Sequence, residues 1–233
     1  LAVGTGEKLN RLKANMPVII NSLKSGGDTV NSAFIESNDF AKSVESGIEA
    51  LDAAYFKPNL IFLRLDNKVR EYSDYEHIMN TFKKQNRGVL LYVPFAKVGI
   101  GLERTLNLWL HQIPEHWQTN KELGNNDLAI LIALLMHQNW QGILNIILIT
   151  EKPQKSGLDM LNKLKMFARL PSDVNYYVLN PSEQKKWEKI PQADLNIASL
   201  KQTKKLDTLL KEVALFRSSF LYTLDSGDQN AQV

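Results

Sequence analysis

Short apolar runs of strand length alternate along the chain with segments whose apolar residues recur every three or four positions. The first periodic segment predicts a helix over Glu7–Ala14, which should end before Pro17 because the residue before a proline avoids helical backbone angles. Two apolar runs follow, Val18–Ile20 and Val30–Ile35, and each predicts a short strand. The chain is therefore expected to open with one helix and two strands.

The same alternation continues to the middle of the chain. The run Leu60–Leu65 is apolar on both faces, as in a central strand of a parallel sheet. The segment Ala96–Glu103 fits either a loop or a short hairpin. The elements predicted for this part are a helix over Asp39–Ala54, the strand over Leu60–Leu65, a helix over Ser73–Phe82 and a strand over Val89–Val93.

The second half repeats this order. Leucine occupies every second position in Thr105–Leu110, a period of two that predicts a half-buried strand. The elements predicted after it are a helix over Leu128–His137, a strand over Ile143–Ile149, a helix over Leu158–Leu164, strands over Val174–Leu179 and Leu195–Ala198, a helix over Leu206–Val213 and a strand over Phe220–Thr223.

Strands and helices in alternation predict an α/β protein with mainly parallel sheets flanked by helices. The 233 residues form two consecutive blocks with a seam at residues 94–124, so we expect a first α/β subdomain over 1–100 and a second over 101–233. The polar segment Asp225–Val233 should fray. The first residue is Leu1 and not Met, which indicates a processed or trimmed chain, or a fragment of a longer protein.

The segment Leu128–Ile149 is apolar enough to suggest a membrane span. A spanning helix needs about 20 consecutive, mostly apolar residues. Here polar residues and a glycine interrupt the run at His137–Gly142, and Asn145 lies beyond. The part before the interruption is rich in Ala and Leu, which favour helix, and the part after it is rich in Ile, which favours strand. We therefore predict a buried helix, a turn and a buried strand.

Composition excludes several classes of protein. The formal net charge is only +3 with basic and acidic residues interspersed, whereas a nucleic-acid interface needs clustered Lys and Arg. The richest basic stretches, Lys152–Lys165 and Lys185–Lys189, are expected to coat solvated helix faces. The chain has no cysteine, which excludes a disulfide framework, a zinc–thiolate site and a cysteine nucleophile, and fits a reducing compartment.

Phosphate-binding loops are the first candidate chemistry, because parallel sheets often bind nucleotides where their strands end. Gly99 and Gly101 form G-x-G without the third glycine, and Ser25–Asp28 precedes a strand instead of following one. The loop Glu151–Gly157 does lie between a strand and a helix N-terminus, where an anion could bind. It lacks the P-loop arrangement, so a plain connecting loop is the default interpretation.

Metal and catalytic motifs are weaker still. The four histidines are His77, His111, His116 and His137; two of them share one polar connection, but no H-E-x-x-H occurs and no G-x-S-x-G either. Asp74 and Glu76 fit helix capping better than acid–base catalysis. The tryptophans, expected to fill core and inter-block space, are Trp109, Trp117, Trp140 and Trp187. We predict no catalytic residue, no metal site and no bound cofactor.

An ordered set of segments carries a family resemblance. These are KSVESGIEALDAAYFKPNLIFLRL (Lys42–Leu65), RGVLLYV (Arg87–Val93), TLNLWLH (Thr105–His111), NNDLAILIALLM (Asn125–Met136), WQGILNIILI (Trp140–Ile149) and LDMLNKLKMFARLPSDVNYYVL (Leu158–Leu179). In order and spacing they resemble the cytosolic C-terminal domain of cation–chloride cotransporters over Lys42–Leu179. The family's D-D-G-G turn appears here as Asn125–Asp127, after an insertion that contains His116 and Trp117, which indicates a distant, prokaryotic-type member.

The resemblance implies a fold related to the universal stress proteins and a domain on the cytoplasmic side of a cell membrane. It implies a regulatory and dimerisation role in electroneutral sodium/potassium–chloride symport, with the transporter's own transmembrane domain and a second copy as partners. Nucleotide binding is not carried over, because the universal-stress-type glycine motif is not found, and ion-binding residues belong to the membrane part. The alternatives are a free-standing universal-stress-type nucleotide-binding protein and an α/β enzyme whose site escapes sequence inspection.

Overall fold

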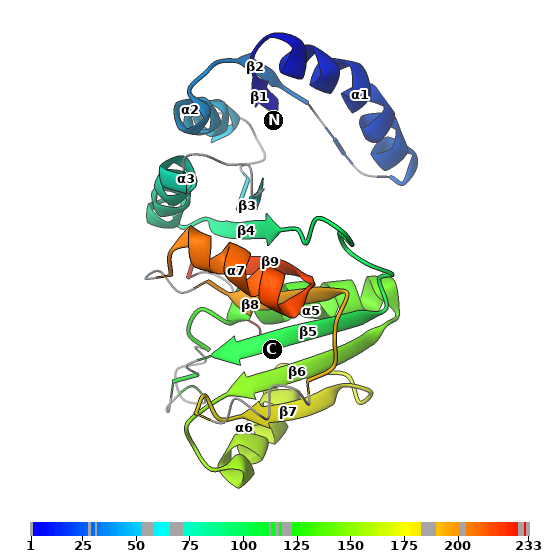
Figure 1. Ribbon diagram of the computed structural model, residues 1–233, viewed down its shortest axis with the longest axis vertical. Helices are drawn as coiled ribbons and strands as arrows, with labels where there is room; N and C mark the ends of the chain where they lie inside the picture. The colour runs from blue at the N-terminus through cyan, green and yellow to red at the C-terminus, as the bar shows by residue number, and fades with distance from the viewer. Residues whose placement is uncertain are drawn as a thin grey trace. The chain divides into compact units, whose positions relative to one another are not determined.

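The computed structural model describes the chain except residues 1, 28, 31, 53–57, 66–71, 112, 115–116, 118–122, 183–189, 201–203, 228–230 and 232–233. The chain forms two compact units. The first unit comprises Leu1–Asn59 with Glu71–Thr81, and the second comprises Leu60–Arg70 with Phe82–Val233. Both are shown in Figure 1.

The first unit contains a two-stranded parallel sheet and three helices. Strand β1 (Ala2–Gly4) pairs with β2 (Phe34–Glu36), and α1 (Gly6–Ser25) connects them. Helix α2 (Phe40–Asp52) follows, and α3 (Tyr72–Lys84) begins in this unit and ends in the second. The strand predicted over Val30–Ile35 is therefore shorter and begins later, since β2 covers Phe34–Glu36.

Two predictions for this unit are wrong. Helix α1 does not end before Pro17 but passes through it, and Val18–Ile20 is helical instead of a strand. A three-residue apolar run fits either structure, and here Met16, Ile20 and Leu23 also recur at helical spacing. The local helical pattern outweighs the hydrogen bond that proline cannot make.

The second unit is built on a seven-stranded sheet in the order β3-β4-β9-β8-β5-β6-β7. All neighbouring strands are parallel except β4 and β9. The strands are β3 (Leu60–Arg64), β4 (Gly88–Val93), β5 (Thr105–His111), β6 (Ile143–Ile149), β7 (Asn175–Leu179), β8 (Leu195–Ser199) and β9 (Ser219–Leu224). The α/β prediction with a mainly parallel sheet is confirmed. The subdomain boundary at residue 100 stays a prediction. Strands β3 and β4 precede that residue and belong to this sheet.

Helices cover both faces of this sheet. Buried leucines of β5 pack with α5 (Asp127–Trp140) and α6 (Gln154–Phe167) in one hydrophobic core. Successive side chains of a strand point to opposite faces, so Trp109 of β5 lies on the other face, where its ring contacts Phe216 of α7 (Leu206–Phe216) at 5.3 Å. In Figure 1, α7 lies in front of the sheet and α5 behind it.

The segment Leu128–Ile149 has the predicted structure of helix, turn and strand. Helix α5 ends at Trp140, Gln141 adopts the left-handed conformation with φ 51°, and β6 begins at Ile143. Between them, a Cβ on Gly142 would collide with the carbonyl of Arg104, so only glycine fits this turn. Among the helices described, none combines the length and the apolar character that crossing a bilayer requires.

Two further predictions need correction. Strand β5 is not half-buried: Asn107 and Trp109, on the face predicted to be exposed, are 2% and 3% exposed. Their polar groups are paired with other strands, which lets them be buried. The polar C-terminal segment is not simply frayed either, because Asp225 and Ala231 are buried against the N-terminus of α5.

Candidate functional site

The strand order of the second unit marks one place as a candidate site. After β5 the chain proceeds outward to β6 and β7, then returns to place β8 and β9 on the other side of β5. In open α/β sheets, ligands bind outside the carboxyl ends of the strands at such a reversal. The candidate site is therefore the carboxyl ends of β5 and β8.

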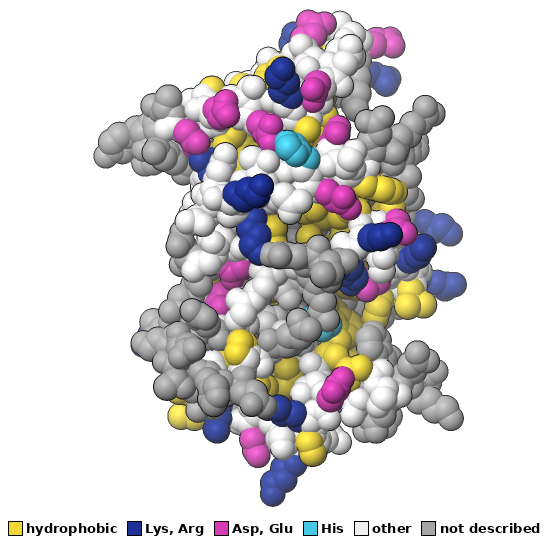
Figure 2. All heavy atoms as spheres, turned by 90° about the vertical axis from the view of Figure 1, so that its left-hand side faces the viewer, with side chains coloured by type: hydrophobic (Ala, Val, Ile, Leu, Met, Phe, Trp, Pro, Cys, Tyr) yellow, Lys and Arg dark blue, Asp and Glu magenta, His cyan; other side chains and the backbone are white. Residues whose placement is uncertain are grey.

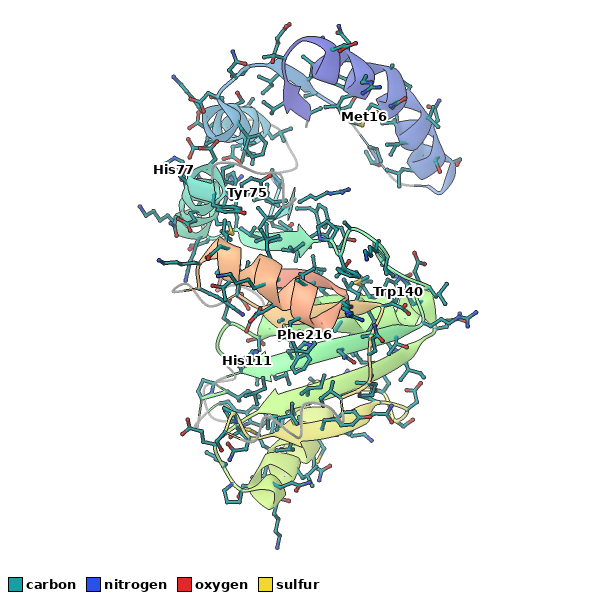
Figure 3. The ribbon with its side chains drawn as sticks, viewed as in Figure 1. Met16, Tyr75, His77, His111, Trp140 and Phe216 are labelled. Atoms are coloured by element: carbon teal, nitrogen blue, oxygen red, sulfur yellow. The ribbon has the colours of Figure 1, made fainter. Side chains whose placement is uncertain are left out.

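A crevice of about 570 Å³ is found there. We call it the carboxyl-edge crevice; its lining includes Trp109 and His111 from β5, Ala198 and Ser199 from β8, and residues of α7 and β9. Figure 2 looks onto this edge, with hydrophobic side chains visible between charged ones in its lower half. Figure 3 shows Phe216 in front of the sheet and His111 at the end of β5.

Aromatic rings form one wall of the crevice. Besides its contact with Trp109, the Phe216 ring contacts Phe220 at 5.5 Å, and Phe220 stacks on Tyr222 at 5.3 Å. These rings come from β5, α7 and β9, so the wall exists only in the folded sheet. Trp109, Phe220 and Tyr222 are almost fully buried, so the wall is apolar but exposes little ring area to a ligand.

One polar group of three residues lies in the same crevice. The Lys204 ammonium pairs with Glu212 at 2.5 Å, and the Tyr222 hydroxyl donates to the same carboxylate at 2.7 Å. Burial, and then the Glu212 charge, raise the pKa of the Tyr222 phenol far above its ordinary value. Tyr222 therefore stays protonated, and Lys204 is engaged by Glu212.

A second hollow of about 490 Å³ shares His111 and Ile149 with the crevice and reaches the predicted anion loop at Glu151 and Lys152. Helix α6 begins at Gln154, so Gly157 lies inside the helix, where its Cα packs against Val178. The glycine of this loop thus serves helix–strand packing, and the loop has no glycine turn for a phosphate.

The Asn125–Asp127 turn joins the carboxyl edge to the C-terminal segment. The Asn126 amide donates to the carbonyl of His111 at 2.8 Å and accepts from the Ser199 hydroxyl at 3.2 Å. Asn125 accepts from the backbone N–H of Asp225 at 2.7 Å. The α5 N-terminal cluster, as we call it, comprises Asn125, Asn126, Asp127, Ser199 and Asp225.

Two carboxylates of this cluster are buried at the N-terminus of α5. Asp225 accepts from the N–H of Leu128, and Asp127 accepts from the N–H groups of Leu123 and Ala231. Burial raises the pKa of Asp127; its backbone donors oppose the rise, and the Asp225 charge adds to it. The cluster ties the strand end, the helix start and the C-terminal segment together.

The amino edge carries a different polar structure, the asparagine ladder: Asn175, Asn145, Asn107 and Asn196, in register on β7, β6, β5 and β8. Asn175 donates to Asn145 at 3.0 Å and Asn145 donates to Asn107 at 2.8 Å. Asn107 then donates to the carbonyl of Pro191 at 2.8 Å. Asn196 pairs outside the ladder: it accepts from the Trp109 indole at 2.8 Å and donates to the Ser218 hydroxyl at 2.9 Å.

Asp194 completes this edge. Its carboxylate accepts from the N–H groups of Leu102, Arg104 and Thr105 at 2.9–3.0 Å. Burial alone would raise its pKa, but these donors and the Arg104 charge outweigh burial and hold the pKa below its ordinary value. Gly101 packs so closely on Asp194 that a Cβ would collide with it, so the G-x-G segment is a turn bound to Asp194.

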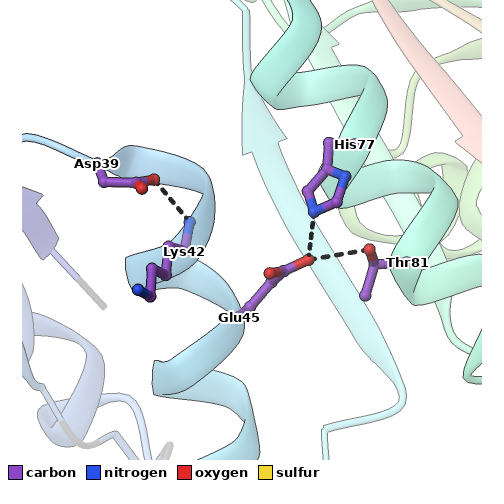
Figure 4. A network of polar contacts seen from close by, with 5 residues as sticks. All are labelled: Asp39, Lys42, Glu45, His77 and Thr81. Atoms are coloured by element: carbon purple, nitrogen blue, oxygen red, sulfur yellow. Dashed lines mark hydrogen bonds and ion pairs between the residues drawn. The ribbon is translucent and has the colours of Figure 1, made fainter.

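The other singled-out residues lie apart from one another. His77 contacts Glu45 at 2.9 Å, and Thr81 donates to the same oxygen, which joins α2 to α3 within the first unit (Figure 4). His137 lies 3.7 Å from Asp173. His116 and Trp187 lie outside the described residues. Where the structure describes the chain, no three His, Asp or Glu side chains gather in a group that could hold a metal.

Two features escaped sequence inspection. The asparagine ladder needs the strand register, although one signal was available: Asn107, Asn145 and Asn196 each interrupt an apolar strand. The crevice could not be predicted from the sequence. Its lining residues, such as Trp109, Lys204 and Glu212, come together only through the strand order.

The comparisons with known proteins agree along the chain. Residues 1–100 match the family model of the first part of the C-terminal domain of prokaryotic cation–chloride cotransporters, and residues 101–232 match that of the second part. No curated protein sequence matches the chain.

Solved structures extend the likeness. The cytoplasmic domain of a prokaryotic cation chloride cotransporter is 29% identical, with a TM-score of 0.79 over 98% of this chain and 85% of that chain. A universal stress protein from Archaeoglobus fulgidus DSM 4304 is 13% identical, with a TM-score of 0.53 over 94% of this chain and 78% of its own. A putative one from Pseudomonas aeruginosa UCBPP-PA14 is 11% identical, with a TM-score of 0.50 over 91% and 77%. These last two support the fold alone. By the two family models, the chain belongs to the prokaryotic cation–chloride cotransporters and corresponds to their cytoplasmic C-terminal domain.

Proposed function

We propose that this domain regulates and dimerises an electroneutral sodium/potassium–chloride cotransporter from the cytoplasmic side of the cell membrane. The observation that carries the proposal is the match of both C-terminal family models, in order, over residues 1–232. Its partners are then the transmembrane domain of the same transporter and a second copy of the chain. It has no catalytic role and binds no nucleic acid.

The α5 N-terminal cluster supports a regulatory role. It connects β5, β8, α5 and the C-terminal segment through buried hydrogen bonds, for example from Leu128 N–H to Asp225 and from Ala231 N–H to Asp127. A movement of the C-terminal segment would therefore change the packing of α5. Regulation needs such a coupling between an element with two arrangements and the transport equilibrium.

Ion flux into proteoliposomes tests this function. The full-length transporter is compared with a version that lacks residues 1–233, with sodium, potassium or chloride replaced in turn. We expect chloride-dependent cation uptake that is insensitive to membrane potential and that changes at least several-fold when the domain is removed. Unchanged uptake would refute the regulatory role, and uptake that follows the membrane potential would refute electroneutral transport.

Nucleotide binding is the second candidate function. It is favoured by the position of the carboxyl-edge crevice at the strand reversal and by the aromatic wall next to Lys205. The engagement of Lys204 by Glu212 weighs against it, because that cation is already neutralised. Calorimetry with ATP and AMP decides: heat that disappears in a variant of the exposed lining residue, Lys205→Ala, supports binding, and no heat at about millimolar ligand refutes it.

A further inference from the structure

Helix α1 carries a row of apolar side chains that its own unit covers only at one end. Leu12, Met16, Ile19 and Leu23 recur every three or four residues, so they lie on one face of the helix and form what we call the α1 ridge. Leu9, on the same face, is 1% exposed where the helix begins next to β1. Ile19 and Leu23 are 54% and 42% exposed, and Met16 lies between the two ends (Figure 3). The ridge is therefore open to solvent in the C-terminal half of α1.

The excess positive charge of the chain is concentrated on this helix. It contains four basic residues and one acid, Glu7 in the first turn, which gives it a formal charge of +3. The whole chain also has a formal charge of +3, so its remainder is neutral on balance. Arg11, Lys13 and Lys24 are exposed, and no acid follows Glu7 in the helix. By contrast, α6 exposes Asp159 among its lysines.

Two of the exposed lysines border the ridge. Lys13 and Lys24 are eleven residues, about three turns, apart and so lie along the same flank of the ridge. A lysine stem can lie on apolar surface while its ammonium group reaches a polar layer. A helix with an apolar face and a basic flank is the kind that lies in the interface of a membrane, with its axis parallel to the surface.

We propose that α1 binds an anionic lipid surface, with its ridge against the acyl chains and its cations among the phosphate groups. The charge selects this occupant, because anionic lipids attract clustered Lys and Arg. A nucleic acid would neutralise the same cations but leave the ridge exposed. The family assignment makes the chain the cytoplasmic domain of a membrane transporter, which brings such a surface within reach. A weak affinity is sufficient there, because attachment to a membrane part keeps the local concentration high.

Flotation of the 233-residue chain with lipid vesicles tests the proposal. Vesicles of phosphatidylcholine are compared with vesicles that contain about 30% phosphatidylglycerol, at about 50 mM and about 200 mM salt. We expect binding to the anionic vesicles that falls at least five-fold at the higher salt, and little binding to the neutral ones. Binding to neither overturns the proposal and leaves a protein as the occupant of the ridge. Equal binding to both also overturns it, because the cations would then contribute nothing.

Two adjacent residues of α1 offer a matched pair of variants. Ile19→Glu places a charge on the ridge and should weaken binding to the anionic vesicles at least ten-fold. Val18→Glu makes the same change of charge in the same helix, but Val18 is 73% exposed and points away from the ridge, so most of the binding should remain. Equal losses in the two variants overturn the orientation that we propose for α1. Circular dichroism verifies that both keep the helical content of the wild type.

The cations are tested with a second matched pair. Replacing Lys13 and Lys24 together by Gln should weaken binding to the anionic vesicles at least five-fold. The control replaces Lys155 and Lys163 of α6 by Gln, which removes the same charge from another exposed helix and should leave binding within about two-fold of the wild type. Equal losses would mean that net charge alone attracts the chain, and would overturn the assignment to α1.

A fluorescent probe reports insertion independently, because the chain has no cysteine. An environment-sensitive dye on Leu23→Cys should shift to shorter wavelength when anionic vesicles are added, whereas the same dye on Val18→Cys should shift little. No shift at either position overturns contact of the ridge with the acyl chains. None of these measurements involves transport, so a failure of the proposed regulation or dimerisation would leave the lipid contact standing.

Discussion

The two edges of the seven-stranded sheet are built from similar polar residues but differ in what those residues leave open. At the amino edge, the asparagine ladder and Asp194 pair with one another and with backbone N–H groups. At the carboxyl edge, Asn126 and Asp127 also pair with backbone, but beside them lies the crevice of about 570 Å³. The amino edge leaves a smaller hollow of about 260 Å³, lined in part by Asn107 and Asn196, so the carboxyl edge offers a ligand the larger space.

The difference separates stability from function within one sheet. Paired amides join β7, β6 and β5, and the bond from Trp109 to Asn196 joins β8. Together they fix the register of four strands, because a slip by one residue would turn each asparagine to the opposite face. The carboxyl edge can change its contacts without unpairing strands, because its polar groups connect loops and a helix terminus. We therefore expect substitutions to cost most at the amino edge.

The largest expected effect is at the centre of the ladder. Asn145→Leu keeps the approximate volume but leaves the Asn107 oxygen and the Asn175 amide without their partner. An unpaired buried polar group costs about 1–3 kcal/mol, so the free energy of unfolding should fall by about 3 kcal/mol in urea titrations. Asn175→Ala, at the exposed end of the same ladder, is the control and should cost less than about 1 kcal/mol, since the shortened side chain lets water take its place beside Asn145. Equal losses would mean that the ladder is not a closed structure.

The next effect is at Asp194. Asp194→Ala removes the acceptor of three backbone N–H groups and should lower the free energy of unfolding by about 2 kcal/mol at pH 7. The folded-state pKa is depressed, so this stabilisation is present above the ordinary value of 3.8 and is lost as the pH falls through the folded-state pKa. The two proteins should thus converge below about pH 4. The control Asp207→Ala, in an exposed pair with Lys211, should stay within about 0.5 kcal/mol of the wild type.

Periodicity and resemblance together predicted most elements of the second unit. The interrupted run Leu128–Ile149 is a helix and a strand, because Gly142 and the polar residues before it mark the turn. The same segment contributes to the family resemblance, which the family models confirm. Local sequence was sufficient to predict an element wherever its residues follow a single periodicity, helical or strand-like.

Local sequence was insufficient where distant residues decide. Asn107 and Trp109 looked exposed because their partners, Asn145 and Asn196, lie on other strands. Pro17 was read as a helix end although the flanking residues sustain the helix. For the candidate site, the carboxyl-edge crevice depends on the strand order, which alternation along the chain does not determine.

The dependence of stability on pH should have opposite signs at the two edges, because the pKa of Asp127 is raised and that of Asp194 is lowered. Burial raises the pKa of Asp127, so the folded state binds its proton more tightly than the unfolded state. The contribution of Asp127 to stability should therefore decrease as the pH rises from about 4 through the raised folded-state pKa, whereas that of Asp194 increases over its own, lower range. Urea unfolding of wild type and Asp127→Asn from pH 4 to pH 7 measures this: the variant should gain relative to the wild type with rising pH. A difference in the free energy of unfolding that stays constant with pH would contradict the raised pKa. The change between pH 4 and pH 7 should be smaller than the losses expected for Asn145→Leu and Asp194→Ala.

The smallest effect is expected inside the crevice. Tyr222→Phe removes the hydroxyl that donates to Glu212 at 2.7 Å, but the carboxylate keeps Lys204 and is 30% exposed to water. Because solvent can complete its hydrogen bonds, the loss should be about 0.5 kcal/mol. Phe keeps the ring that stacks on Phe220, so the aromatic wall is preserved. If Tyr222→Phe cost as much as Asn145→Leu, the Tyr222 hydroxyl would be as shielded from solvent as the ladder amides, and the crevice would be a structural cavity instead of a ligand site.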